Sequence, residues 1–260
     1  MNSLDLGIQQ IASFLFILTR CSGIFVFTPF LGNALVPVHV RIVISVCLAY
    51  LLVLSVPMVT LPGNLTLLTM LVGLGGELLV GMAIGFAAHT VFAGFLYAGQ
   101  LIGFQIGLSF VNTVDPQSSS RSTTLAIFLN LLAMMLFLGF NGHHWLIESV
   151  SRSFTTVPTF HVQITSQLIA KVGDMVSRIL VIGFQVAAPV MSVLILTDLV
   201  LGLIGRSAPQ IHIMIIGFPI KILVGLSCFG LGLYFLPSAM RDFSVQLVRD
   251  LHGLVRLLGS

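Results

Sequence analysis

An apolar run from Leu67 to Phe110 is the feature that most restricts how this chain can fold. A bilayer core about 30 Å thick needs roughly 20 apolar residues per helical crossing, so this run is too long for one crossing. It predicts either two helices broken near His89–Gly94 or one long, bent helix that leaves the bilayer. Both forms belong to a membrane protein.

The composition extends this conclusion to all 260 residues. Hydrophobic residues make up 57% of the chain and charged residues only 7%, and the mean hydropathy is +1.11. A soluble domain carries roughly a quarter charged residues. All strong periodicities are helical, so we expect an all-α, polytopic membrane protein of kinked helices with about six apolar segments. Besides the long run, these segments are Ile8–Phe30, Val40–Pro57, Thr124–Phe140, Ile179–Ile204 and Ile211–Leu236.

We expect one domain over residues 1–260, and changes in polarity along the chain divide it into four parts. They are N-terminal helices over 1–110, a polar loop over 107–122, further helical hairpins over 123–236 and an amphipathic helix over 237–260. Pro189 and Pro219 stand inside apolar runs, where a missing N–H bends a helix.

The C-terminal helix has an apolar stripe and a separate basic face with Arg241, Arg249 and Arg256. This pattern predicts that the stripe lies on an anionic membrane surface or docks on a partner. The stripe consists of Met240, Phe243, Leu247, Leu251, Leu254 and Leu258.

Glycines recur at four-residue spacing along the long apolar run. Such spacing lines one helix face with bare backbone and predicts close helix packing, either within the chain or against another subunit. The glycines are Gly81, Gly85, Gly99, Gly103 and Gly107.

Charged residues inside the apolar segments predict ion pairs, because an unpaired charge in such surroundings is costly. Glu77, Asp198, Lys221 and Arg20 are the residues concerned. Asp198 and Lys221 lie on neighbouring predicted helices, so an ion pair between them is geometrically reasonable, within one chain or between two. We prefer a structural pair to a proton relay, since a relay needs a chain of titratable groups.

The sequence offers few groups for chemistry. Ser118–Ser120 have no local His or Asp to activate them and no G-x-S-x-G elbow around them. His143 and His144 are adjacent rather than at the i, i+4 spacing of helical metal sites, and interfacial placement explains them better. We therefore expect no catalytic residue, cofactor, metal or nucleic-acid partner. The cysteines lack C-x-x-C spacing and are interpreted as small buried hydrophobes: Cys21, Cys47 and Cys228.

Three stretches of the sequence resemble one known family closely. They read "GQLIGFQIGLSFVNTVDPQSS", "LFLGFNGHHWLIESVSRSF" and "AAPV…DLVLGLIGRSAPQIHI…GFPIKI". These stretches are similar to the FliR family, a membrane subunit of the flagellar type III export gate, and the resemblance covers nearly the whole chain. The run with Asp198, Pro209, Pro219 and Lys221 also looks like a D…P…K run of the sister subunits, which favours charge pairing between subunits.

The resemblance implies a single export-gate domain in the bacterial inner membrane, at the flagellar basal body. It implies helical assembly with the sister subunits FliP and FliQ into a gate core through which unfolded flagellar export substrates pass. It also implies contact with FlhB, other export-apparatus proteins, proximal rod proteins and membrane lipid. A small-solute transporter and a scaffold without a pore are the alternative functions.

The resemblance places the polar loop after Gly107 in the lumen, where it helps to close the resting pore. Irregular backbone at membrane depth is tolerated only where protein or water receives its polar groups. In this interpretation two bulky residues block the lumen and the others fold and stiffen the loop. The residues are Phe110 and Val111, followed by Asn112, Asp115, Pro116 and Ser118 to Ser120.

Overall fold

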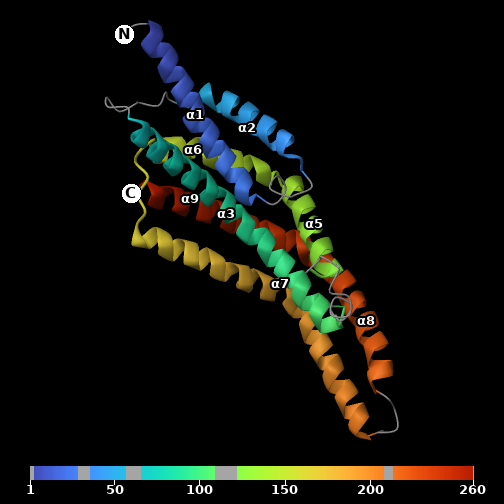
Figure 1. Ribbon diagram of the computed structural model, residues 1–260. Helices are drawn as coiled ribbons and strands as arrows, with labels where there is room; N and C mark the ends of the chain where they lie inside the picture. Colours follow the sequence, from blue (N-terminus) through green and yellow to red (C-terminus); the bar gives the residue numbers. More distant parts are fainter. Residues whose placement is uncertain (1–2, 29–35, 57–65, 109–121, 208–212, 260) are drawn as a thin grey trace. The chain divides into compact units, whose positions relative to one another are not determined.

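The computed structural model describes residues 3–28, 36–56, 66–108, 122–207 and 213–259. Every regular element in these ranges is a helix, which confirms the all-α prediction. Figure 1 shows them in chain order: α1 (Ser3–Phe27), α2 (Val38–Val53), α3 (Leu67–Ile106), α5 (Thr124–Gly139), α6 (Gly142–Thr156), α7 (Ser166–Ser207), α8 (Ile213–Gly232), the short 3-10 helix η1 (Leu233–Phe235) and α9 (Leu236–Leu258).

The helices form two compact units. Unit 1 comprises Met1–Thr90, Asn141–Met175 and Ser244–Ser260, and unit 2 comprises Val91–Phe140 and Val176–Phe243. Three helices, α3, α7 and α9, supply residues to both units. The single domain expected over residues 1–260 stays a prediction.

The long apolar run forms one helix, α3, of 40 residues. At about 1.5 Å per residue such a helix is roughly 60 Å long, twice the bilayer core of about 30 Å. Of the two forms that the sequence allows, the structure therefore has the single helix, with no break at His89–Gly94. Helix α7, with 42 residues, has a similar length.

Four helical stretches of the described chain are long and apolar enough to cross a membrane: Gln9–Phe27, Leu67–Ile106, Ser166–Ser207 and Ile215–Leu258. Helices α5 and α6 add a fifth if they are one broken span. Helix α2 is apolar but has only 16 residues. The prediction of a polytopic membrane protein is confirmed.

Two prolines lie inside helices, as the sequence predicts. Pro189 is inside α7 and Pro219 is inside α8. In Figure 1, α7 changes direction where its colour passes from yellow to orange, the stretch that contains Pro189. The hydroxyl of Ser192 donates to the carbonyl oxygen of Pro189 at 3.0 Å, so a side chain binds the backbone at this bend.

The core of unit 1 forms around α1 and the first part of α3. Phe16 is fully buried and its ring meets Phe160 edge-on, with 5.1 Å between centroids. The last part of α9 completes this core, because Leu251 and Leu254 are both 0% exposed. Leu247 and Leu258 are buried as well.

This burial corrects the prediction for the C-terminal stripe. Leu254 and Leu258 line an apolar pocket together with Phe27 and Leu79 of the same unit. The apolar stripe therefore packs inside the protein's own fold and not on a membrane surface or a partner. The sequence shows a helix that needs an apolar neighbour, but the chain itself supplies that neighbour.

The core of unit 2 is aromatic. Phe92 and Phe137 are buried with ring centroids 5.2 Å apart, and Phe95 meets Phe243 at 5.9 Å, both edge-on. These pairs join α3 to α5 and to the start of α9. Aromatic pairs of this geometry stabilise by roughly 1 kcal/mol beyond the area they bury.

Candidate functional site

The polar segment after α3 begins at a well-defined helix end. The amide of Gly107 donates to the carbonyl oxygen of Phe104 at 3.0 Å, and the amide of Leu108 donates to that of Gly103 at 3.0 Å. This pair of bonds is a Schellman motif, which places a residue of positive φ just after the helix, and Gly107 has φ 95°. A Cβ atom on Gly107 would lie 2.8 Å from the ring of Phe218. Gly107 thus ends α3 and also lets α8 approach it.

The same segment ends at Thr123, the N-cap residue of α5. Its hydroxyl oxygen accepts from the amide of Ala126 at 3.2 Å and donates to the carbonyl oxygen of Gly99 at 3.3 Å. A Cβ atom on Gly103 would lie 2.7 Å from that oxygen. Both ends of the segment are therefore held against the last two turns of α3.

The residues expected to close a pore lie between these two anchors. All of them fall outside the described residues: Phe110, Val111, Asn112, Asp115, Pro116 and Ser118.

A charge cluster lies beside the end of α3 in unit 2. The ammonium group of Lys221 is 2.8 Å from Oδ1 of Asp198 and donates to Oδ2 at 3.0 Å. The side-chain amide of Gln105 also donates to Oδ2 of Asp198 at 3.0 Å. Gln105 comes two residues before Gly107, so α3, α7 and α8 all meet at the base of the polar segment.

The pair is only partly buried within one chain. The side chain of Asp198 is 42% exposed and that of Lys221 is 22% exposed. Large apolar side chains around them are exposed too, and contiguous surface of this kind is normally covered by lipid or another chain. They include Ile195, Leu196 and Leu199 on α7 and Leu223 on α8.

A second charge cluster, in unit 1, is closed to solvent. Arg20 and Glu77 form an ion pair, and both side chains are 0% exposed. The guanidinium also donates to the hydroxyl of Ser153 at 2.9 Å and to the carbonyl oxygen of Val157 at 3.1 Å, and it stacks 3.9 Å from the ring centroid of Phe154. Arg20 therefore joins α1, α3 and the end of α6.

The predicted close-packing glycines all meet other parts of the same chain. In unit 1 a Cβ atom on Gly81 would collide with the carbonyl oxygen of Arg20, and one on Gly85 would lie 2.5 Å from that of Ile24. In unit 2 a Cβ atom on Gly99 would collide with the backbone of Ala126. The bare faces let α1 and α5 approach α3 at backbone distance.

The sequence did not predict the ion pair between α7 and α9. Lys171 of α7 lies 2.8 Å from Oδ1 of Asp250 on α9, and their side chains are 23% and 9% exposed. Both residues sit in amphipathic helices among other polar residues, so no apolar run marked them. The pair fixes the buried stripe of α9 against α7 within unit 1.

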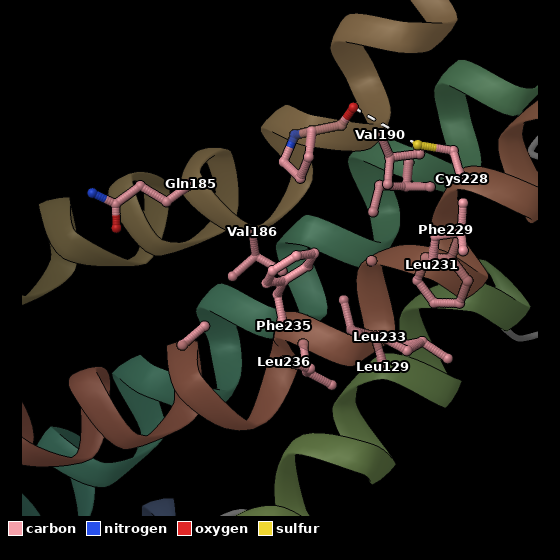
Figure 2. A pocket seen from close by; sticks show the side chains of 14 residues that line it. Leu129, Gln185, Val186, Val190, Cys228, Phe229, Leu231, Leu233, Phe235 and Leu236 are labelled. Carbon is pink, nitrogen blue, oxygen red and sulfur yellow. Dashed lines mark hydrogen bonds between the residues drawn. The ribbon is translucent and has the colours of Figure 1, made fainter.

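A cavity of about 440 Å³ lies in unit 2 at the bend of α7. Figure 2 shows its lining, in which the amide of Gln185 points away from the apolar side chains. The thiol of Cys228 lies 3.9 Å from the carbonyl oxygen of Pro189, while Phe229 and Leu236 close other sides. This lining is apolar and differs from the convergent polar site that a solute transporter requires.

The groups considered for chemistry form no metal-binding cluster among the described residues. No cluster of three or more His, Cys, Asp or Glu side chains that could hold a metal occurs within the described ranges. The rings of His143 and His144 contact each other at 4.3 Å between centroids. Cys21 is buried as predicted, but Cys47 is exposed and Cys228 is only partly buried, so the prediction of buried cysteines is wrong for these two. Cys47 is outside the buried set of α2, which is Ser45, Ala49 and Leu52.

These features define a class of protein: a polytopic helical membrane protein in which the described charges inside apolar segments are paired and helices α7 and α8 carry exposed apolar side chains. The family model of bacterial export proteins, family 1, matches residues 11–247. The chain belongs to this family and, within it, to the FliR proteins.

Individual relatives agree with this assignment. The flagellar biosynthetic protein FliR of Pectobacterium carotovorum subsp. carotovorum is 34% identical over 184 residues, which cover 71% of this chain and 70% of that protein. FliR of Bacillus subtilis (strain 168) is 29% identical over 268 residues, 100% of this chain and 99% of that protein. The surface presentation of antigens protein SpaR of Shigella sonnei is 28% identical over 210 residues, 80% of this chain and 79% of that protein. The chain is a membrane protein of the flagellar type III export apparatus.

Proposed function

We propose that this chain is a channel-forming core subunit of the flagellar export gate in the bacterial inner membrane. It assembles with FliP and FliQ, contacts FlhB, and adjoins other export-apparatus and proximal rod proteins. Unfolded flagellar proteins leave the cytoplasm through this gate. The segment over residues 107–122 closes the pore at rest.

The main support for this proposal is that both ends of the polar segment are bound to α3. Gly107 and Thr123 are both fixed to the end of α3, so the polar segment starts and ends at the same place in unit 2. A loop with polar side chains and irregular backbone needs protein or water around it at membrane depth. A protein-lined pore supplies both.

The contacts at the base of the loop suggest how it is released. Gln105 binds Asp198 of α7, and Gly107 touches Phe218 of α8, so both helices contact the last turn of α3. A neighbouring subunit or a substrate that displaces α7 and α8 therefore also displaces the point from which the loop departs.

The exposed apolar faces of α7 and α8 are where we expect sister subunits. In water these faces would be an aggregation hazard, and in the gate they bury against neighbouring helices. Burial there lowers the effective dielectric around the half-exposed ion pair of Asp198 and Lys221, which strengthens it.

Deletion of residues 112–119 tests the proposal. The deletion leaves both anchors in place, so we expect the complex to assemble and to leak small ions across the membrane. Replacement of the same residues by a Gly/Ser linker of equal length is the matched control for loop length, and it should leak less than the deletion.

Ion permeability of cells that express each variant is the measurement. Unchanged permeability with the deletion, in complexes of normal composition, would contradict a closing loop and favour a scaffold without a pore. Substrate-dependent uptake by the purified chain alone in liposomes would instead support a small-solute transporter.

A further inference from the structure

Exposed basic side chains gather on one face of unit 1, where the last turns of α9 lie beside α6. Arg249, His252 and Arg256 are exposed and follow one another at three- and four-residue spacing, so they form a row along one side of α9. Arg152 of α6 joins this row, because its guanidinium lies 3.4 Å from Nε2 of His252. We call these four residues the basic face.

The basic face contains more positive charge than its own surroundings neutralise. Glu148 pairs with Arg152, with 2.6 Å between Oε1 and the guanidinium. Within the described ranges, Arg249 and Arg256 form no ion pair and no hydrogen bond between side chains. Like charges on one face repel each other, so this face becomes more stable when anionic groups lie against it.

The fold fixes the row of α9 from behind. The part of its apolar stripe from Leu247 to Leu258 is buried. On the same helix Asp250 pairs with Lys171 at 2.8 Å, and the amide of Gln163 donates to the carbonyl oxygen of Leu258 at 3.1 Å. The arginines therefore stand on a helix that is already in place, and a partner does not have to order the backbone that carries them.

The side chains of this face exclude the lipid hydrocarbon as its neighbour. Exposed large apolar side chains are numerous on α7 and α8, whereas among the described residues of α6 and α9 only Ile147 and Val245 are of this kind. Hydrocarbon does not cover a face of arginine, histidine and glutamate side chains. The candidate span Ile215–Leu258 has 44 residues, about twice what one crossing needs, so its last turns can lie beyond the bilayer.

A membrane surface is also a poor neighbour for the basic face. A helix that lies on lipid headgroups is held there by an apolar side that enters the bilayer. The apolar side of α9 is buried within its own chain from Leu247 to Leu258, so it cannot enter lipid. The anionic partner that remains is a polar protein surface.

We propose that the basic face of α6 and α9 docks an acidic surface of another protein chain, outside the lipid hydrocarbon. Arg249 and Arg256 are seven positions apart in the sequence, which is about 10 Å along a helix. Carboxylates at positions i and i+7 of a partner helix have the same spacing and pair with both guanidiniums. This inference concerns unit 1 and does not depend on a closing loop or a pore.

Binding of a designed acidic helix by the purified full chain tests this surface. The probe is a fluorescent helical peptide with Glu at positions i, i+3 and i+7, and its control peptide has Gln there. We compare wild type with the double variant Arg249→Ala with Arg256→Ala, by fluorescence anisotropy at low salt. Arg206→Ala removes an exposed arginine of unit 2 and is the matched control. We expect wild type and the control variant to prefer the Glu peptide about tenfold, and the double variant to lose this preference.

The peptide measurements also contain the results that overturn the proposal. Equal binding of the two peptides by wild type is one, and an equal loss of preference in Arg206→Ala is another, because it would indicate general charge attraction. Displacement of the Glu peptide by phosphatidylglycerol micelles at equal charge concentration, but not by neutral micelles, would assign the face to lipid headgroups and overturn it as well.

Cells that contain the complete export apparatus supply a second test. A photoreactive residue in place of Gln246, an exposed position one turn before Arg249, should form adducts with a protein segment rich in carboxylates. The charge reversal Arg249→Glu with Arg256→Glu should abolish these adducts. The absence of adducts in wild type, adducts with lipid only, or adducts that survive the charge reversal would each contradict an acidic protein partner.

Discussion

The ion pairs of the two units differ in how completely their own chain surrounds them. Arg20 and Glu77 in unit 1 are fully buried, and the guanidinium has two more acceptors and an aromatic ring within the same unit. Asp198 and Lys221 in unit 2 are 42% and 22% exposed and share one further partner, Gln105. The chain surrounds the first pair on all sides, whereas it leaves the second pair partly exposed.

This difference in burial predicts that the two pairs contribute differently to the stability of the fold. A buried charge that loses its partner destabilises the fold by several kcal/mol, whereas an exposed pair contributes about 0–1 kcal/mol. The pair in unit 1 therefore holds the helices of one chain together. The pair between Asp198 and Lys221 contributes little to the folding stability of the isolated chain, so we expect it to stabilise contacts with other subunits.

Loss of the carboxylate in unit 1 should have the largest effect. Glu77→Ala leaves the charge of Arg20 buried without its counterion, so we expect a loss of about 3–5 kcal/mol in unfolding free energy. The measurement is the thermal stability of the purified protein and its amount in the membrane fraction.

Two further variants sharpen this test. Glu148→Ala breaks an exposed pair with Arg152, whose side chains are 54% and 60% exposed, and should change stability by less than about 0.5 kcal/mol. The double variant Arg20→Met with Glu77→Leu removes both charges and should recover most of the lost stability. Equal stability of Glu77→Ala and Glu148→Ala would refute the distinction between the pairs.

Close packing of α1 on α3 should give an intermediate effect. Gly81→Ala places a methyl group against the carbonyl oxygen of Arg20, a backbone atom that cannot turn away, so we expect a loss of about 1–3 kcal/mol. Gly75→Ala is the matched control on the same helix, because nothing lies within 4 Å of its new Cβ atom. The control should be neutral or gain up to about 1 kcal/mol from helix propensity, as measured by thermal unfolding. Identical effects of the two changes would argue against backbone contact at Gly81.

Charge reversal in unit 2 should affect the isolated chain least. Asp198→Lys is expected to change its unfolding free energy by about 1 kcal/mol or less, because the pair is half-exposed. Assembly should fail nevertheless, and adding Lys221→Asp should partly restore it. Co-purification of the sister subunits is the measurement, and their normal recovery with the single variant would remove the role in assembly.

Much of the fold is readable from the sequence because the apolar runs are long and helical. The need for charge pairing was predictable in the same way, since Glu77 and Asp198 interrupt such runs and require partners. The sequence could not decide between one helix and two in this region, because an uninterrupted helix and a broken one have the same hydropathy. The structure has one helix, Leu67–Ile106.

The sites that the sequence analysis missed depend on contacts between distant segments. The apolar stripe of α9 predicts some apolar neighbour, and only the fold shows that the chain itself supplies it, in unit 2 for Phe243 and in unit 1 for Leu247 to Leu258. Asp250 lies among other polar residues, so its pairing with Lys171 has no local signal. Gly107 fits the four-residue glycine spacing, which hid its second role as the residue that ends α3.

The position of the loop in the resting complex is the central claim and can be measured directly. A photoreactive amino acid in place of Asn112, in cells that contain the complete export apparatus, reports what surrounds the loop. The proposed gate predicts adducts with FliP and FliQ and little labelling of position 112 by a soluble reagent. Full labelling from bulk solvent, with no adducts to either subunit, would contradict the account.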